Sequence, residues 1–193
     1  MVKEIIRTMR ALDAKLTIER WLADGSFSAR LPEVELLRGV PQPEDYHAEG
    51  DAFVHTMLCV ASVPEDADPR VFWGVLLHDI GKAETTEFIK GRWRSWGHAD
   101  KGAVMVPAVM ERLGLPELGA DVAWLVKHHT FHFSWNLEPG ARLTRNQHRF
   151  VEHPLFPLLL QVCRADAAGS YGGSDKGMKI DQIVAILEDE GAL

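Results

Sequence analysis

The sequence has little of what marks a secreted or membrane protein. It holds only two cysteines, Cys59 and Cys163, among its 193 residues. Two are too few for a disulfide scaffold, and a cytosolic protein would keep both reduced. No apolar run approaches the ~20 residues that span a bilayer, and the N-terminal stretch "MVKEIIRTMRALDAKL" is too highly charged for a signal peptide. We therefore expect a cytoplasmic protein with no membrane partner.

Positive charge is also scarce. Lys and Arg number 21 against 28 Asp and Glu, which gives a formal net charge of −7. A protein that tracks phosphates along nucleic acid would show the opposite balance, so we expect no strong general nucleic-acid binding. Two local basic clusters, Arg92 with Arg94 and Arg142 with Arg145 and Arg149, could receive phosphates or an RNA end, or could be solvated surface.

Apolar residues recur at helical spacing through most of the chain. The length suits one domain, and 46% of the residues are hydrophobic, which is enough for a core. The spacing predicts helices over residues 3–23, 51–62, 69–80, about 98–113, 117–132, 154–168 and 178–190. Pro107 must kink its helix or mark the true start.

One segment departs from the helical pattern. The stretch "ETTEFIKGRWRSWG" alternates and turns at Lys90-Gly91, which predicts a short β-hairpin near residues 84–96. The expected fold is therefore all-α, a mostly helical bundle with one short hairpin. We expect a single domain over residues 1–193, on which the helices 3–23 and 178–190 pack.

Ionisable residues end several of the apolar stripes. In "VLLHDIGKA" (75–83), the stripe that contains Val75 and Leu76 continues to Asp79, and two other stripes end at Asp166 and at His129 with His132. Each one alone could be a hydrogen-bonded core residue, a cap or an ion pair. Because a buried carboxylate must be paired or bound to metal, several together indicate a site for Fe, Mn, Co, Ni, Zn or Mg.

These residues also carry a family resemblance. His55, then His78-Asp79 within "LLHDIGK", then the distant Asp166 resemble the HD superfamily of metal-dependent phosphohydrolases. Over about residues 20–170, segments such as "GHADKGAVMVPAVMERLGLP", "LVKHHTFHF" and "CRADAAGS" look like the C-terminal HD domain of bacterial CCA-adding tRNA nucleotidyltransferases. The acidic catalytic motif and Gly-Ser signature of the nucleotidyltransferase head are not in this sequence, so nucleotide addition is not carried over.

The resemblance implies a ligand set and an HD-domain helical bundle. His55, His78, Asp79 and Asp166 would hold one divalent ion. A second ion, bridged by Asp79, would use two further histidines, which match His98 and either His128 or His129. We favour His129, because it continues the apolar face of its helix and its neighbour points about 100° away. Whether one or two ions bind, and which metal (Ni, Mn, Co, Mg, Fe or Zn), stays open.

Other residues have candidate roles near this site. Lys82, one turn after His78, could contact a substrate phosphate or be a cation at a helix C-terminus. His128, His132 and Arg145 are further candidates for substrate binding. Asp51 could orient the ring of His55 or cap its helix. Trp93, Trp96, Trp124 and Trp135 could stack a base or belong to the core or its rim, and both cysteines are expected to be buried small hydrophobes.

The resemblance implies an HD-type metal-dependent phosphohydrolase. We expect Asp79, as a metal ligand, and Lys82, from its position one turn after His78, to take part in catalysis. Metal-activated hydroxide would cleave phosphomonoesters or phosphodiesters of nucleotides or RNA ends, as a 2′,3′-cyclic phosphodiesterase, 2′-nucleotidase or phosphatase. The partner would be a small phosphorylated substrate or an RNA 3′ end. The alternatives are a 5′-deoxynucleotidase, a di-iron HD-fold oxygenase and a non-catalytic nucleotide-binding module; the oligomeric state stays open.

Overall fold

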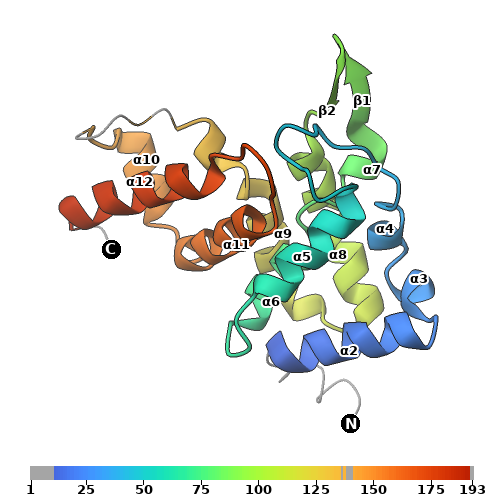
Figure 1. Ribbon diagram of the computed structural model, residues 1–193. Coiled ribbons are helices and arrows are strands. Elements are labelled where there is room, and N and C mark those ends of the chain that lie inside the picture. Colours follow the sequence, from blue (N-terminus) through green and yellow to red (C-terminus); the bar gives the residue numbers. More distant parts are fainter. Residues whose placement is uncertain (1–10, 136, 138–140, 192–193) are drawn as a thin grey trace.

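The computed structural model of the chain is a bundle of helices with one projecting β-hairpin (Figure 1), which confirms the expected fold class. It describes residues 11–135, 137 and 141–191. The longer helices are α2 (Ala11–Ala23), α5 (Ala52–Ser62), α6 (Pro69–Leu77), α8 (His98–Leu113), α9 (Gly119–His128), α11 (Phe156–Ala168) and α12 (Lys176–Asp189). The shorter ones are α3 (Phe27–Arg30), α4 (Pro32–Glu35), α7 (Lys82–Thr85) and α10 (Arg145–Val151), with the 3₁₀ turns η1 (Pro116–Leu118) and η2 (Phe131–Phe133).

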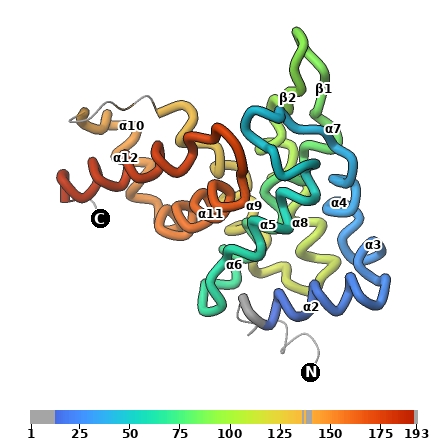
Figure 2. The backbone as a smooth tube through the Cα atoms, viewed as in Figure 1, coloured from blue at the N-terminus to red at the C-terminus, as the bar shows by residue number. Residues whose placement is uncertain are grey.

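Helices α5, α6, α9 and α11 pack on one another and form the centre of the bundle (Figure 2). Helix α8 lies along α9, α2 packs against α6, and α12 packs against α11. Phe72, Leu76 and Leu125 are among the fully buried side chains. The absence of a side chain at Gly74 lets α6 approach its neighbours, since a Cβ there would lie 3.1 Å from a methyl group of Val162. This packing brings the ends of α6, α9 and α11 together.

Most helix boundaries differ from the expectation by a few residues. The helix expected over 69–80 ends at Leu77, and the one expected over 117–132 is α9 with a 3₁₀ turn on either side. Of the helix expected over 3–23, residues 3–10 lie outside the described residues. Helix α8 begins at His98 and continues through Pro107, so this proline does not mark its start.

The hairpin lies within the range predicted for it. Strands β1 (Thr86–Ile89) and β2 (Arg92–Ser95) pair antiparallel, with Phe88 opposite Trp93. The turn falls at Lys90-Gly91, where both residues have positive φ angles, 52° and 77°. The hairpin projects from the end of the bundle near α7 (Figure 1).

None of the helices in the described part of the chain has both the length and the apolar character that a membrane crossing requires.

Candidate metal centre

Five elements bring the predicted ligands to one buried place. His55 lies on α5, His78 and Asp79 follow α6, and Asp166 lies on α11. His98 is the first residue of α8, and His129 directly follows α9. The turn that carries His78 and Asp79 passes close to the start of α8, because Gly81 has no side chain. A Cβ on Gly81 would lie 2.1 Å from the carbonyl oxygen of His98.

Four donor atoms form the first group, which we call site 1. His55 Nε2 lies 3.0 Å from Asp166 Oδ1 and 3.9 Å from Asp79 Oδ2. His78 Nε2 lies 3.2 Å from Asp79 Oδ2 and 3.8 Å from Asp166 Oδ1. Ligands of one ion at ~2.1 Å lie about 3.0–3.4 Å apart at octahedral and tetrahedral angles. The four atoms are therefore close to the spacing that one divalent ion requires.

Three donor atoms form a second group, site 2, on the other side of Asp79. His98 Nε2 lies 3.2 Å from His129 Nε2 and 3.4 Å from Asp79 Oδ1. His129 Nε2 lies 4.0 Å from the same carboxylate oxygen. Asp79 thus presents Oδ2 to site 1 and Oδ1 to site 2, which is the arrangement of a bridging carboxylate.

Backbone carbonyls fix three of the imidazole rings in the same way. Nδ1 of His78, His98 and His129 lies 2.7 Å from the carbonyl oxygen of Val75, Ser95 and Val126, respectively, three residues earlier in each case. An Nδ1–H that donates to a carbonyl leaves Nε2 as the unprotonated nitrogen, and this is the atom that points into the site. The three rings are therefore oriented as metal ligands by the chain segment that directly precedes each of them.

His55 is oriented by a carboxylate that the sequence reasoning missed. Its Nδ1 lies 2.8 Å from Glu49 Oε1, and the Glu49 side chain is fully buried. The same oxygen accepts from His47 Nδ1 at 2.7 Å. Asp51 instead caps α5, since its Oδ1 accepts the Val54 N–H. Of the two roles considered for Asp51, the structure thus shows the helix cap.

Two lysines neutralise the two carboxylates. Lys82 Nζ lies 2.7 Å from Asp79 Oδ2 and donates to Gln42 Oε1. Lys176 Nζ donates to Asp166 Oδ1 at 2.6 Å. Burial acts to raise the pKa of Asp79, but His78 and Lys82 hold it well below the usual value. Burial likewise acts to raise the pKa of Asp166, but Lys176 together with the hydrogen bond from His55 and the nearby His78 holds it well below the usual value. Lys176 begins α12, and no sequence pattern had marked it.

The pKa values of the histidines differ because their surroundings differ. Burial acts to lower the pKa of His55, but its hydrogen bonds to Asp166, Cys59 and Glu49 together outweigh burial and raise the pKa to about 11. Burial lowers the pKa of His98 and places that of His129 well below its usual value. The neutral form of His98 and His129 is the form that binds metal.

The donor set contains buried polar atoms that the protein itself does not satisfy. Within the described residues, His78 Nε2 is buried and accepts no hydrogen bond, and Asp79 Oδ2 accepts none apart from its ion pair with Lys82. A buried acceptor without a partner is costly. A divalent ion would satisfy both atoms, and a mixture of imidazole and carboxylate donors is the set that borderline and hard divalent metals prefer. The residues present therefore fit a metal.

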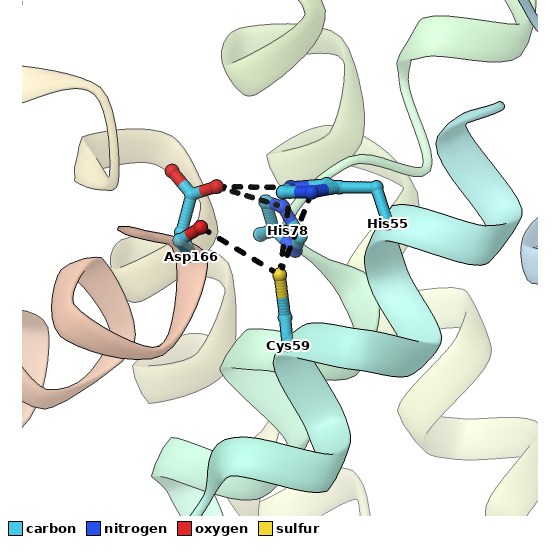
Figure 3. Close-up of side chains that lie close together, drawn as sticks. All are labelled: His55, Cys59, His78 and Asp166. Carbon is cyan, nitrogen blue, oxygen red and sulfur yellow. Dashed lines mark hydrogen bonds and ion pairs between the residues drawn. The ribbon is translucent and has the colours of Figure 1, made fainter. Parts of the chain in front are cut away.

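Cys59 also borders site 1 (Figure 3), one turn after His55 on α5. Its Sγ lies 3.4 Å from Nε2 and 3.8 Å from Nδ1 of His55. The sulfur contacts the imidazole between its two nitrogens, and burial raises the pKa of the thiol. Both cysteines are free and buried, as the sequence predicted.

Three candidate substrate-binding residues do not line the cavity over the ligands, as far as the described residues define it. His128 packs on Trp124, with ring centroids 4.7 Å apart. His132 is fully buried, and neither ring nitrogen has a hydrogen-bond partner in the described part of the chain. Arg145 is exposed at the start of α10. Lys82, in contrast, does line this cavity.

The comparison with known proteins agrees with this site. The family model of the HD domain matches residues 46–168, a span that contains all six predicted ligands. The chain belongs to the HD domain family. It is therefore an HD-type metal-dependent phosphohydrolase.

Curated relatives of this HD protein carry the name Multifunctional CCA protein. One from Alkalilimnicola ehrlichii is 39% identical over 79% of this chain and 38% of its own length. Others from Ectopseudomonas mendocina and Halorhodospira halophila are 35% and 34% identical, each over 88% of this chain and 42% of their own. The chain spans about two fifths of the length of these relatives, and its relation to their HD region confirms the resemblance noted in the sequence.

Proposed function

We propose that this HD protein hydrolyses phosphomonoesters or phosphodiesters of nucleotides or RNA ends, as a 2′,3′-cyclic phosphodiesterase, 2′-nucleotidase or phosphatase in the cytoplasm. The observation that carries the proposal is Asp79, whose two oxygens face two separate groups of histidines. Two donor groups that share one carboxylate are typical of sites that hold two ions against a phosphate. The name of the relatives supports an RNA end as one substrate.

The residues divide the work of hydrolysis. His55, His78, Asp79 and Asp166 would hold one ion, and Asp79, His98 and His129 a second. Ions held there would supply a hydroxide at neutral pH and neutralise the phosphate oxygens. A new P–O bond would form to the hydroxide while the P–O bond to the ester oxygen breaks, and the released ester oxygen would take up a proton from water. The carbonyls that fix the imidazoles keep this arrangement without reorganisation during the reaction.

Two lysines are placed to hold the phosphate. Lys82 and Lys176 both line the cavity over the ligands, and each is bound to a carboxylate oxygen that faces site 1. Metal bound to those carboxylate oxygens would neutralise their negative charge. The two ammonium groups would then face the cavity with charge to offer an anion, and charge-assisted hydrogen bonds to phosphate are strong. We therefore assign Lys176 to phosphate binding beside Lys82.

The test is a panel of substrates and metals. It comprises 2′-, 3′- and 5′-nucleotides, 2′-deoxynucleoside 5′-phosphates and 2′,3′-cyclic nucleotides, each with Ni, Mn, Co, Mg, Zn or Fe. We expect phosphate release or ring opening that requires metal and is lost in Asp79→Ala. Activity that survives in Asp79→Ala would contradict the mechanism. An oxygen-dependent product formed by the iron-loaded protein, with no hydrolysis, would contradict the function.

A further inference from the structure

The cavity over the metal centre is larger than a phosphate group requires. Its volume is about 540 Å³, within the range of sites that hold whole small molecules. Metal ligands form one part of its wall, and the two lysines lie beside them. The rest of the wall consists mainly of Pro43, Tyr46 and His47 of one loop and Arg92, Trp93, Arg94, Ser95 and Trp96 of the hairpin.

The hairpin presents cations and aromatic rings in alternation. Arg92 and Arg94 lie on the same face of β2, because alternate residues of a strand share a face. The guanidinium carbon of Arg94 lies 5.4 Å from the centroid of the Trp96 ring, and that of Arg92 lies 4.7 Å from the Tyr46 ring. Both arginines are half-buried. Arg92 is also paired with Asp45, with 3.1 Å between its guanidinium and the carboxylate, whereas Arg94 places its charge beside the Trp96 ring for phosphate and base to use together.

Arg94 and Trp96 each have an unused binding capacity. The Nε of Arg94 is buried and has no hydrogen-bond partner among the described residues. A buried donor without a partner is costly, so a turn of the Arg94 side chain that brings this N–H to a phosphate oxygen in the cavity would be favourable. The Trp96 side chain is 67% exposed, although an indole of this size is normally covered by packing. An exposed ring beside a guanidinium is a platform on which a nucleobase stacks.

We propose that Arg94 and Trp96 form a subsite for the nucleotide adjacent to the one that carries the hydrolysed phosphate. The preferred substrate is then the end of a strand of at least two nucleotides. The charge distribution supports a polyanion at this place, because four cationic side chains border the cavity of a chain whose net charge is −7. The assignment rests on the proposed function, which supplies the phosphate over the metal centre.

The test compares two substrates with the same reacting end. Adenosine 2′,3′-cyclic phosphate carries only that end, and ApA with a terminal 2′,3′-cyclic phosphate adds one nucleotide. We expect the unchanged protein to prefer the dinucleotide in kcat/KM by about tenfold, a factor at the lower end of what one stacked base contributes. Arg94→Gln and Trp96→Ala should each bring this ratio close to one.

Phe88→Ala is the matched control. Phe88 lies on the same hairpin and is 61% exposed, but it is not among the residues that line the cavity, and it pairs with Trp93, whereas Arg94 pairs with Glu87. This variant should keep the tenfold preference. A loss of preference in Phe88→Ala equal to that in Trp96→Ala would show a general effect of the hairpin and overturn the subsite.

The outcomes separate the subsite from the proposed function. If the unchanged protein opens both cyclic phosphates at the same kcat/KM, the subsite is wrong and the hydrolase stands. If it opens neither, the hydrolase activity on such ends is wrong. Binding of fluorescein-labelled hexaadenylate with a 3′-phosphate then decides the subsite: weaker binding by Arg94→Gln than by Phe88→Ala supports it, and equal binding overturns it.

Discussion

The interior of the site and its mouth are held by different means. In the interior, His78, His98 and His129 are fixed through Nδ1 by backbone carbonyls, which leaves Nε2 free to bind metal without any exchange of partner. At the mouth, Lys82 and Lys176 are bound to the very carboxylates that metal would use. The comparison teaches that these three imidazole ligands are preorganised, whereas the two lysines must exchange partners when metal and phosphate bind.

The largest expected effect comes from removing the shared carboxylate. Asp79→Asn keeps the shape of the side chain but loses the charge that both donor groups need, so hydrolysis should fall by at least about 10³-fold. Steady-state rates with saturating metal measure this. Circular dichroism of the metal-free variant serves as the control for folding, and a folded variant that retains a tenth of the activity would refute a bridging role for Asp79.

The next largest effect is expected at His55, the interior histidine whose ring is fixed by a side-chain carboxylate. His55 is fixed by the Glu49 carboxylate, with a second contact from its Nδ1 to the Gly169 carbonyl at 3.1 Å. Loss of such a partner typically weakens metal binding about 10- to 100-fold, and we expect this for Glu49→Gln in competition with a chelating dye. Asp51→Asn, which retains an acceptor for the Val54 N–H, should bind metal like the unchanged protein. Equal metal affinity in all three proteins would exclude the role of Glu49.

A smaller effect, confined to substrate binding, is expected at the mouth. Lys176→Met should raise KM for the best substrate of the panel about tenfold, as the loss of one charged hydrogen bond implies, with a smaller change in kcat. Lys176→Arg should restore part of the affinity. The control is Lys179→Met on the same helix, where Nζ pairs with Asp175. A change in kcat alone for Lys176→Met would argue against phosphate binding.

The smallest effect is expected at Cys59. Its sulfur contacts His55 between the two ring nitrogens, so we expect packing and no metal bond. Cys59→Ser should lower the thermal midpoint by a few degrees at most, because a hydroxyl replaces a buried thiol, and should leave the metal content unchanged. Absorption spectra of the cobalt-loaded protein check this: a thiolate-to-cobalt band that disappears in Cys59→Ser would show that the sulfur is a ligand.

Sequence periodicity was sufficient to predict the helices that pack in the core. It placed α5 and the hairpin closely, because their apolar faces and the Lys90-Gly91 turn are local signals. The short helix α10 has no apolar stripe and was missed. Its capping box, in which Thr144 and Gln147 satisfy each other's backbone, is visible in the sequence as Thr-x-x-Gln and could have revealed its start.

The sequence was sufficient to predict the six ligands, because each of them ends an apolar stripe or matches a family motif. Glu49 and Lys176 had neither signal. Glu49 lies in a loop two residues before the cap of α5, and Lys176 starts a helix beside a glycine-rich segment. The position of Glu49 depends on how chain segments more than a hundred residues apart meet, as in the hydrogen bond from the Tyr171 N–H to Glu49. Lys176 is close in sequence to its partner Asp166, but it reaches that carboxylate through the way the loop between α11 and α12 folds back. Local patterns do not contain that information.

The most direct test of the two-ion site is a titration of the metal-free protein with the metal that supports the highest activity. Hydrolysis of the best substrate is followed as metal is added, and bound metal is counted by mass spectrometry. The account predicts no hydrolysis in the chelated protein, and activity that rises to a plateau at two ions per chain. Hydrolysis that persists in the chelated protein, or a plateau with a single bound ion, would contradict it.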